Sequence, residues 1–212
     1  ALLHNSVNVM SSQREQDGIK EYPLFTHREL DGLTRRFLTR RPGQPFNIAD
    51  TGVKAEFFDA GHLPGSVGMM LDIDGLKVFY TGDVHFEDQT VSRGAEFPTE
   101  HADVLIMECT RGAVERAPGY SRQAESDRLA DVITRTMARG GSVLIPVFAI
   151  GKTQEILMML HELKGQGKVK ADIPVHIGGL SSKMTQIVDK HSNEGRRHHP
   201  GFRLLESMTG IV

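Results

Sequence analysis

The chain has 212 residues, a formal net charge of −2, 39% hydrophobic residues and 22 glycines, which is the profile of an α/β protein with one sizeable core or two smaller ones. Because such a charge does not attract phosphate, a nucleic-acid ligand would have to be held by a local basic patch or by a metal. The single cysteine, Cys109, excludes an internal disulfide and a cysteine-rich zinc cluster.

The cysteine usage also indicates the compartment. One cysteine is typical of a reducing environment, so we expect the cytoplasm, or the nucleus if the organism is eukaryotic. The longest apolar runs, such as SVLIPVFAI, are too short to span a bilayer, and the first residues lack the pattern of a signal peptide.

A helix is predicted over residues 26–40, within an otherwise polar stretch. Thr26 is a suitable N-cap, and the apolar residues that follow recur at helical spacing until Pro42 and Gly43 end the pattern. These apolar residues are Leu30, Leu33, Phe37 and Leu38.

The next part of the chain, up to about residue 110, is predicted to be mostly β. Three strand-like segments follow one another, VKAEFFDA, VGMMLDI and LKVFYTG. Asp74-Gly75 joins the second to the third and favours a tight hairpin, because both central residues of such a turn need positive φ. The segment ADVLIMECT predicts a further, buried strand.

From Ser121 onward the apolar period changes to that of helices. Helices are predicted over 121–141, 151–165 and 181–191, and short strands over 142–148 and 173–179. Strands that alternate with helices indicate βαβ units and a parallel sheet. The composition shift at GAVERAPG predicts a domain boundary, which divides the chain into residues 1–112 and 113–212.

His62 comes before the first strand of the predicted hairpin, and Asp83 comes after the second strand. Histidine and aspartate at the ends of neighbouring strands are suitable zinc ligands, because rigid elements place them more accurately than loops do. By spacing alone an alternative stays open, in which His62 is a hydrogen-bonded turn residue and Asp83 caps a turn after Gly82.

The sequence around His62 and Asp83 resembles that of a known protein family. The stretch AGHLPGSVGMMLDIDGLKVFYTGD resembles the third and fourth metal-binding motifs of the metallo-β-lactamase fold. The stretches DVLIMECTRG, GGSVLIPVFAIGKTQEIL and IPVHIGGLSSKMTQIV resemble RNA-processing nucleases that carry an inserted β-CASP domain. These nucleases include the RNA-cleaving subunit of the cleavage and polyadenylation machinery and its prokaryotic relatives, and the likeness runs from about Leu24 onward.

The resemblance implies a fold and an activity. It implies an α/β fold, with part of a metallo-β-lactamase αββα sandwich in residues 1–112 and part of a β-CASP domain with parallel βαβ units in residues 113–212. It also implies a zinc-dependent ribonuclease acting on single-stranded RNA. Two zinc ions about 3.5 to 4 Å apart stabilise the attacking and leaving oxygens of a phosphodiester displacement.

The resemblance also implies roles for three residues. His62 would bind one zinc, and the carboxylate of Asp83 would bridge two. Asp83 and Glu108 would be the catalytic carboxylates, with Glu108 at the domain junction supporting the site through a contact to a metal-ligating or catalytic histidine. His85, two residues after Asp83, points toward the same end of the sheet.

The sequence departs from the family's pattern in one major respect. It has no HxHxDH motif, which supplies most of the zinc ligands, and it begins at Ala1 and not at methionine. We therefore expect an internal fragment of a longer enzyme. With His62 and Asp83 as its only assigned ligands, the fragment is expected to bind no zinc tightly and to cleave no RNA, because zinc sites need three or four ligands. Beside Glu108, Cys109 and Arg111 replace the serine and tyrosine common in relatives.

Three basic residues are candidates for contact with RNA. Lys152 opens a helix whose N-terminal N–H groups suit a phosphate backbone. Gly151-Lys152-Thr153 also resembles the end of a P-loop, but Pro146 stands where that motif requires glycine. Arg196 and Arg197 lie in the basic stretch GRRHHPGFR, for which a solvated loop is the alternative.

Two other functions stay open at this stage. One is a metallo-β-lactamase-fold hydrolase of small esters or thioesters, which the inserted α/β segment after Gly112 disfavours. The other is a non-catalytic scaffold or RNA-binding relative, which the presence of both His62 and Asp83 disfavours. A homodimer is compatible with the sequence, and the choice between internal and terminal cleavage is open.

Overall fold

The computed structural model describes residues 2–208 and 210–211. The chain forms two compact units, Ala1–Arg41 and Pro42–Val212, and each is described by itself. The boundary predicted between residues 112 and 113 falls inside the second unit and stays a prediction. In the part of the chain that the structure describes, no helix is both long and apolar enough to cross a membrane.

The first unit consists of two helices, α1 (Leu2–Asp17) and α2 (His27–Thr34). The sequence pattern missed α1, which buries Val7 and Met10. Helix α2 begins as predicted at a Thr26 N-cap. The backbone N–H of Thr26 donates to Glu29 Oε2 at 2.7 Å, and the N–H of Glu29 donates to Thr26 Oγ1 at 3.3 Å, which forms a capping box.

The prediction that this helix reaches residue 40 is wrong, because α2 ends at Thr34. Of the four apolar residues at helical spacing only Leu30 is buried, while Leu33, Phe37 and Leu38 are exposed. A short helix in water depends on packing of its apolar face, and three of these four residues do not supply it.

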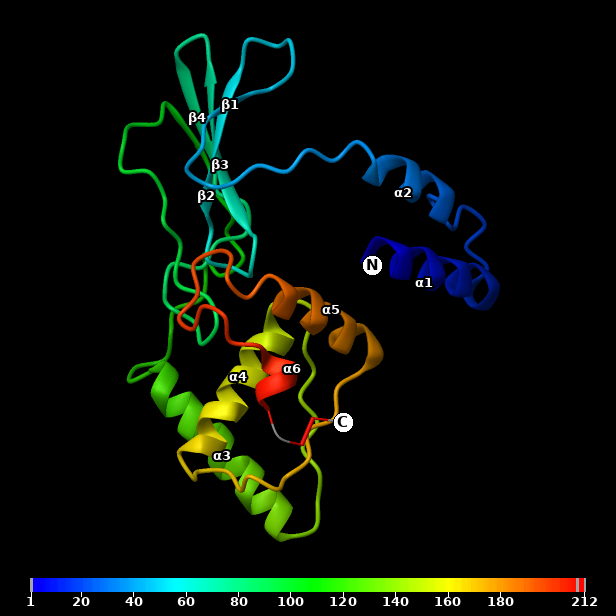
Figure 1. Cartoon of the computed structure of the whole chain (residues 1–212), viewed down its shortest axis with the longest axis vertical. Coiled ribbons are helices and arrows are strands. Elements are labelled where there is room, and N and C mark those ends of the chain that lie inside the picture. The colour runs from blue at the N-terminus through cyan, green and yellow to red at the C-terminus, as the bar shows by residue number, and fades with distance from the viewer. Residues whose placement is uncertain (1, 209, 212) are drawn as a thin grey trace. The chain divides into compact units, whose positions relative to one another are not determined.

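The second unit carries a mixed five-stranded sheet (Figure 1). Its strands are β1 (Phe46–Asn47), β2 (Lys54–Asp59), β3 (Val67–Ile73), β4 (Leu76–Tyr80) and β5 (Val104–Ile106), in the order β1-β2-β3-β4-β5. The first three pairings are antiparallel, and β5 runs parallel to β4. The strands predicted in this part of the chain are therefore confirmed.

The predicted hairpin between β3 and β4 is confirmed in its details. Asp74 and Gly75 adopt φ values of 53° and 90°, and Ile73 pairs with Leu76 across the turn. The Asp72 carboxylate accepts a hydrogen bond from the N–H of Gly75 at 2.9 Å, which stabilises the turn. Met70 and Phe79 form a buried pair on adjacent strands.

Strand β5 forms where a strand was predicted, but it is not buried. Leu105 keeps 59% of its surface exposed and Ile106 keeps 51%. The strand contacts β4 through one edge, and no residue of β5 belongs to the buried core of the described chain. Its apolar composition predicted a buried strand, but within the described residues its side chains stay largely exposed.

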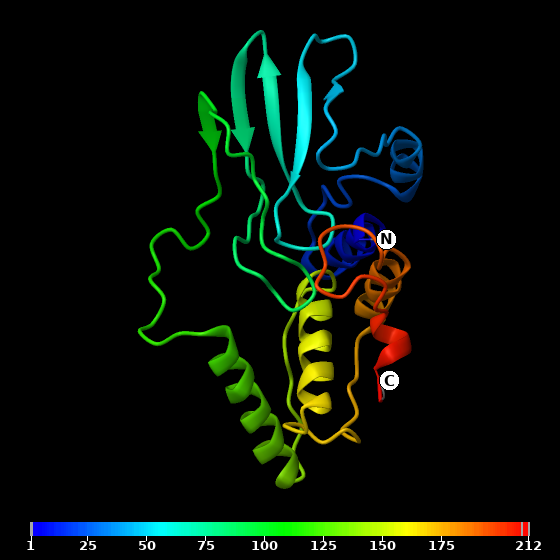
Figure 2. The same ribbon diagram turned by 60° about the vertical axis from the view of Figure 1, so that its left-hand side comes forward.

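Four helices follow the sheet: α3 (Arg122–Ala138), α4 (Lys152–Gly165), α5 (Gly179–Lys190) and α6 (Leu204–Ser207). The first three confirm predicted helices, and Ser121 caps α3 by accepting the N–H of Ala124 at 3.1 Å. Figure 2 shows α4 between α3 on one side and α5 and α6 on the other. Side chains of α3, α4 and α6 form one apolar core, which includes Ala130, Ile133, Leu157, Leu160, Leu163 and Leu204.

The predicted parallel βαβ units are wrong for the described residues. Neither 142–148 nor 173–179 forms a strand, and Val175 makes only an isolated bridge, to Ile211. Leu144 and Phe148 are 92% and 82% exposed. A strand needs a partner whose backbone completes its hydrogen-bond ladder, and neither segment has one within this part of the chain.

Candidate functional site

His62 and Asp83 meet at one end of the hairpin, as the sequence predicted. His62 lies in the loop between β2 and β3, and Asp83 follows β4 after Thr81 and Gly82. His62 Nε2 lies 4.0 Å from Asp83 Oδ2, and the side chains are 35% and 76% exposed. This distance is too long for a direct hydrogen bond, and both side chains keep part of their surface accessible.

The loop that carries His62 is held by short-range hydrogen bonds. Asp59 accepts the N–H of Gly61 at 2.8 Å, and Ser66 Oγ accepts the N–H groups of His62 and Leu63, each at 3.1 Å. Gly61 has a φ of 64°, and a Cβ at this position would overlap backbone atoms of residues 85, 94 and 95. The histidine therefore projects from a loop whose backbone is closely packed.

Glu108 lies directly beside this pair, two residues after β5. Its Oε1 accepts the N–H of Val84 and its Oε2 accepts that of Thr110, both at 3.0 Å. The hydrogen bonds from Thr110 and Val84 lower the pKa of Glu108, and the nearby charge of His62 lowers it further. The direct partners of Glu108 are the backbone N–H groups of Val84 and Thr110, and the contact to a histidine that the resemblance implies stays a prediction.

His85 is half-buried behind this group. Its backbone N–H donates to the carbonyl oxygen of Ala60 at 2.9 Å, which ties the strand end to the His62 loop. Burial lowers the pKa of the His85 side chain, and the positive charge of Lys152 lowers it further. A neutral imidazole is therefore favoured at this position.

The donor set was tested for its fit to zinc. Within residues 2–208 and 210–211, no group of three or more histidine, cysteine, aspartate or glutamate side chains is arranged to hold a metal ion. His62 and Asp83 supply two donors, whereas zinc in proteins takes three or four. The described residues therefore do not form a complete zinc site.

The amino-terminal end of α4 contacts the His62 loop through Gln89. Lys152 Nζ donates to Gln89 Oε1 at 2.8 Å, and Gln89 Nε2 donates to the carbonyl oxygens of Gly61 and His62 at 2.7 and 3.1 Å. Partial burial lowers the pKa of Lys152. The P-loop alternative finds no support, because Gln154 Oε1 already accepts the N–H of Gly151 at 2.7 Å.

A buried carboxylate that the sequence did not predict lies in the same turn of α4, three residues after Lys152. Glu155 accepts the N–H groups of Thr90, Val91 and Ser92 at 2.6, 3.0 and 3.2 Å. Arg122 Nη2 lies 3.2 Å from the same carboxylate and donates to Thr90 Oγ1 at 2.5 Å. The available signal was a glutamate that adjoins the apolar face of a helix, next to Ile156 and Leu157.

Arg196 and Arg197 do not form a solvated basic loop. Arg197 is only 8% exposed, and its guanidinium donates to the carbonyl oxygens of Glu194 and Val188 at 3.2 and 3.1 Å. The structure therefore lends no support to the predicted contact of Arg197 with RNA, which stays a prediction. Arg196 is more accessible and pairs with Glu96 at 3.0 Å.

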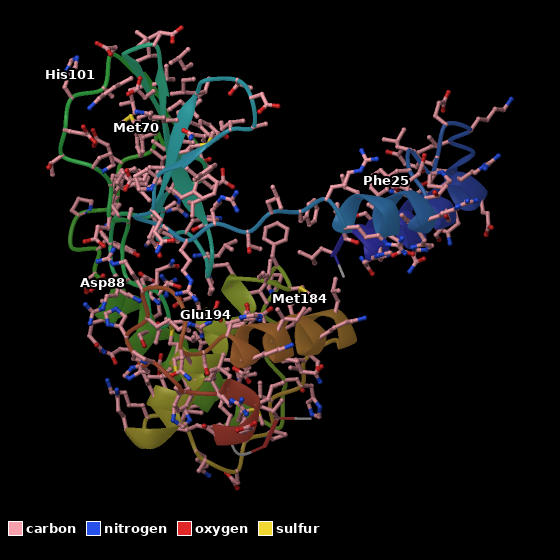
Figure 3. All side chains as sticks on the ribbon, turned by 45° about the horizontal axis from the view of Figure 1, so that its top comes forward. Phe25, Met70, Asp88, His101, Met184 and Glu194 are labelled. Atoms are coloured by element: carbon pink, nitrogen blue, oxygen red, sulfur yellow. The ribbon has the colours of Figure 1, made fainter. Side chains whose placement is uncertain are left out.

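This segment pairs with the one that carries Gln89. Arg93 N–H donates to the Arg196 carbonyl oxygen at 3.0 Å, and His198 N–H donates to that of Val91 at 3.1 Å. A cleft of about 330 Å³ lies beside the pairing, lined by Asp88, Gln89, Thr90, Arg122, Glu162, His198 and His199. Figure 3 shows Asp88 and Glu194 below the sheet, which Met70 marks, and at about the level of Met184 of α5.

Several known proteins resemble this chain in sequence. No protein-family model matches it. It is 34% identical over 142 residues to the RNase J-like protein of Methanocaldococcus jannaschii, covering 66% of this chain and 33% of the relative. It is 36% identical over 137 residues to cleavage and polyadenylation specificity factor subunit 3-I of Arabidopsis thaliana, covering 65% of this chain and 19% of the relative.

A third relative is endoribonuclease YSH1 of Saccharomyces cerevisiae, 34% identical over 167 residues, covering 78% of this chain and 21% of the relative. The homologues of this chain are thus β-CASP nucleases of the metallo-β-lactamase fold, which confirms the resemblance found in the sequence. The matched part of the chain spans about a third of the first relative and about a fifth of the other two.

Proposed function

We propose that this chain is part of a metal-dependent ribonuclease that hydrolyses phosphodiester bonds in single-stranded RNA. The observation that carries the proposal is the meeting of His62 and Asp83 at 4.0 Å, at one end of the hairpin. That pair lies in a chain whose homologues include endoribonucleases.

The proposal extends to the fold. The mixed sheet of residues 46–106 would form part of an αββα sandwich, and the helices after residue 113 would form part of a β-CASP domain. Two features support this assignment. The sheet leaves β5 exposed, as expected of a strand that another layer covers, and helices α3, α4 and α6 share one apolar core.

We further propose roles for the side chains at the site. His62 would hold one zinc ion, Asp83 would bridge two, and Glu108 would fix the backbone that follows Asp83 through its bond to Val84. A dinuclear zinc centre supplies Lewis-acid stabilisation of the attacking and leaving oxygens in phosphodiester hydrolysis. The remaining ligands would come from residues outside this pair. Lys152 and Arg196 would contact the RNA backbone electrostatically.

The test uses the full-length protein that contains this chain and an RNA labelled internally with both ends blocked. Asp83→Ala should reduce cleavage to background and lower the bound zinc. Asp131→Ala is the matched control, because that aspartate lies exposed on α3 and pairs with Arg135. Equal cleavage by the Asp83 variant and the wild-type protein would show that the ligand assignment is wrong. Cleavage of the blocked RNA indicates internal cutting.

A non-catalytic RNA-binding relative would bind this RNA without cutting it, and an ester or thioester hydrolase would leave it intact and unbound. We also propose the cytoplasm, or the nucleus of a eukaryote, as the compartment. The single cysteine supports this proposal. A homodimer stays a prediction.

A further inference from the structure

Gln89 takes no part in the proposed metal and RNA contacts, yet it lies buried at the centre of the site. Its exposed fraction is 4%, and both ends of its amide are used. Nε2 donates to the carbonyl oxygens of Gly61 and His62, and Oε1 accepts from Lys152. A single side chain therefore joins the loop that carries His62 to the first turn of α4.

The segment that carries Gln89 is itself fixed by α4. The three N–H groups that follow Gln89, those of residues 90–92, donate to the carboxylate of Glu155. The backbone N–H of Gln89 donates to the carbonyl oxygen of Ser92 at 2.9 Å. Because Lys152 and Glu155 lie in the same turn of α4, the helix sets both the backbone and the side chain of Gln89.

The His62 loop is also closely packed on the side that faces away from Gln89, so its backbone has little room to move. Gly61 packs so closely against residues 85, 94 and 95 that the loop cannot shift toward them. The side chain of Leu63, one residue beyond His62, would contact a Cβ added to Gly151 at 3.1 Å. The His62 loop thus lies between the segment 85–95 and the end of α4, and Gln89 supplies the hydrogen bonds of that packing.

We propose that Gln89 is a positioning residue for the nuclease reaction, which holds the His62 loop against α4, and that Lys152 completes the connection. This inference rests on the proposed function, because His62 matters to the reaction only as a metal ligand. An ammonium group has three N–H donors, and Lys152 uses one of them in its hydrogen bond to Gln89. A phosphate bound by the other two N–H donors of Lys152 would therefore be connected to the His62 loop through the side chain of Gln89.

The experiment compares variants of the full-length protein by amide hydrogen exchange of residues 61–66 and by RNA-cleavage kinetics. Gln89→Leu removes the donor and the acceptor, and it should speed exchange in this loop about tenfold, the factor for one or two lost hydrogen bonds. It should lower kcat and leave KM for RNA near the wild-type value. Lys152→Met should raise KM and speed loop exchange less.

The matched control is Gln123→Leu, the same change at an exposed position of α3 whose amide donates to Asp127. It should leave loop exchange and kinetics unchanged. Gln89→Glu separates the two halves of the connection. It keeps a partner for Lys152 but places carboxylate oxygens against two carbonyl groups, so the loop should loosen as in Gln89→Leu.

Loop exchange in Gln89→Leu that is no faster than in Gln123→Leu overturns the proposal, and so does a rise in KM alone. If Gln89→Leu does not fold, Gln89→Glu is judged by the same two measurements, and Lys152→Met, at an exposed position, provides a third reading. A wild-type protein that cuts no RNA, while loop exchange responds as expected, overturns the proposed function and leaves the positioning contact in place.

Discussion

Single side chains carry much of the organisation of this protein, and Glu155 is the clearest case. Its carboxylate is 8% exposed and is surrounded by three backbone N–H groups and the guanidinium of Arg122. A buried carboxylate is tolerated only when its oxygens are satisfied in this way. The charge is thus part of the structure, and it orders the segment from which Gln89 projects.

Replacing Glu155 by glutamine should therefore destabilise the protein although the shape is preserved. The amide group would turn a donor toward N–H groups that need an acceptor, at a cost of about 2 kcal/mol. Urea unfolding of the chain measures the difference. Glu125→Gln, on the exposed face of α3 beside Arg128, should change stability by less than about 0.5 kcal/mol. Equal losses in the two variants would contradict the assignment.

The sequence predicted some of the site's residues and not others, depending on how far apart the interacting residues lie along the chain. His62 and Asp83 were singled out because they flank a hairpin that the Asp74-Gly75 turn predicts, and the resemblance to metallo-β-lactamase motifs then implied their role as ligands. Gln89 and Glu155 were missed because their partners lie 27 to 65 residues away in sequence. A polar residue in a loop or beside the apolar face of a helix gives no local sign of such a partner.

Among the helices and strands, the sequence pattern predicted best those elements whose backbone hydrogen bonds form within the element itself. Helices α3, α4 and α5 confirm their predictions, since helical hydrogen bonds are internal to the segment. The segments 142–148 and 173–179 have the apolar content of strands, but a strand depends on a neighbour that composition does not reveal. Helix α1 was missed because it buries only Val7 and Met10.

The loop between β2 and β3 offers a matched pair of glycines for testing the packing around His62. Gly61 and Gly65 both have positive φ, but a Cβ at Gly65 would meet no atom, whereas one at Gly61 would overlap backbone. Gly65→Ala should cost about 1 kcal/mol through its backbone conformation. Gly61→Ala should cost at least about 2 kcal/mol more, because the neighbouring backbone must move.

Thermal or urea unfolding of the two alanine variants measures these costs, and an NMR spectrum of each shows whether the His62 signal shifts. Similar losses of stability would indicate that the loop is more loosely packed than the contacts of Gly61 imply. A His62 signal displaced in Gly61→Ala and retained in Gly65→Ala is the expected result.

At the scale of the molecule, the described residues bring together two donors of the proposed metal centre. Two ligands give a zinc affinity far below that of a site with three or four. The isolated 212-residue chain should therefore retain no stoichiometric zinc after dialysis, and it should not cleave RNA. Metal analysis of the dialysed chain, with the full-length protein as the positive control, is the measurement. Stoichiometric zinc on the isolated chain would contradict this expectation.

The Glu155 contact also constrains how the chain can move. Its carboxylate belongs to the helical half of the chain, and the three N–H groups it binds belong to the half that carries the sheet. Arg93 and Arg196 connect the same two halves through their backbones. Residues 90–93 are therefore held to α4 and to the segment around residue 196, and any relative motion of the two halves should displace most the elements farthest from residues 90–93.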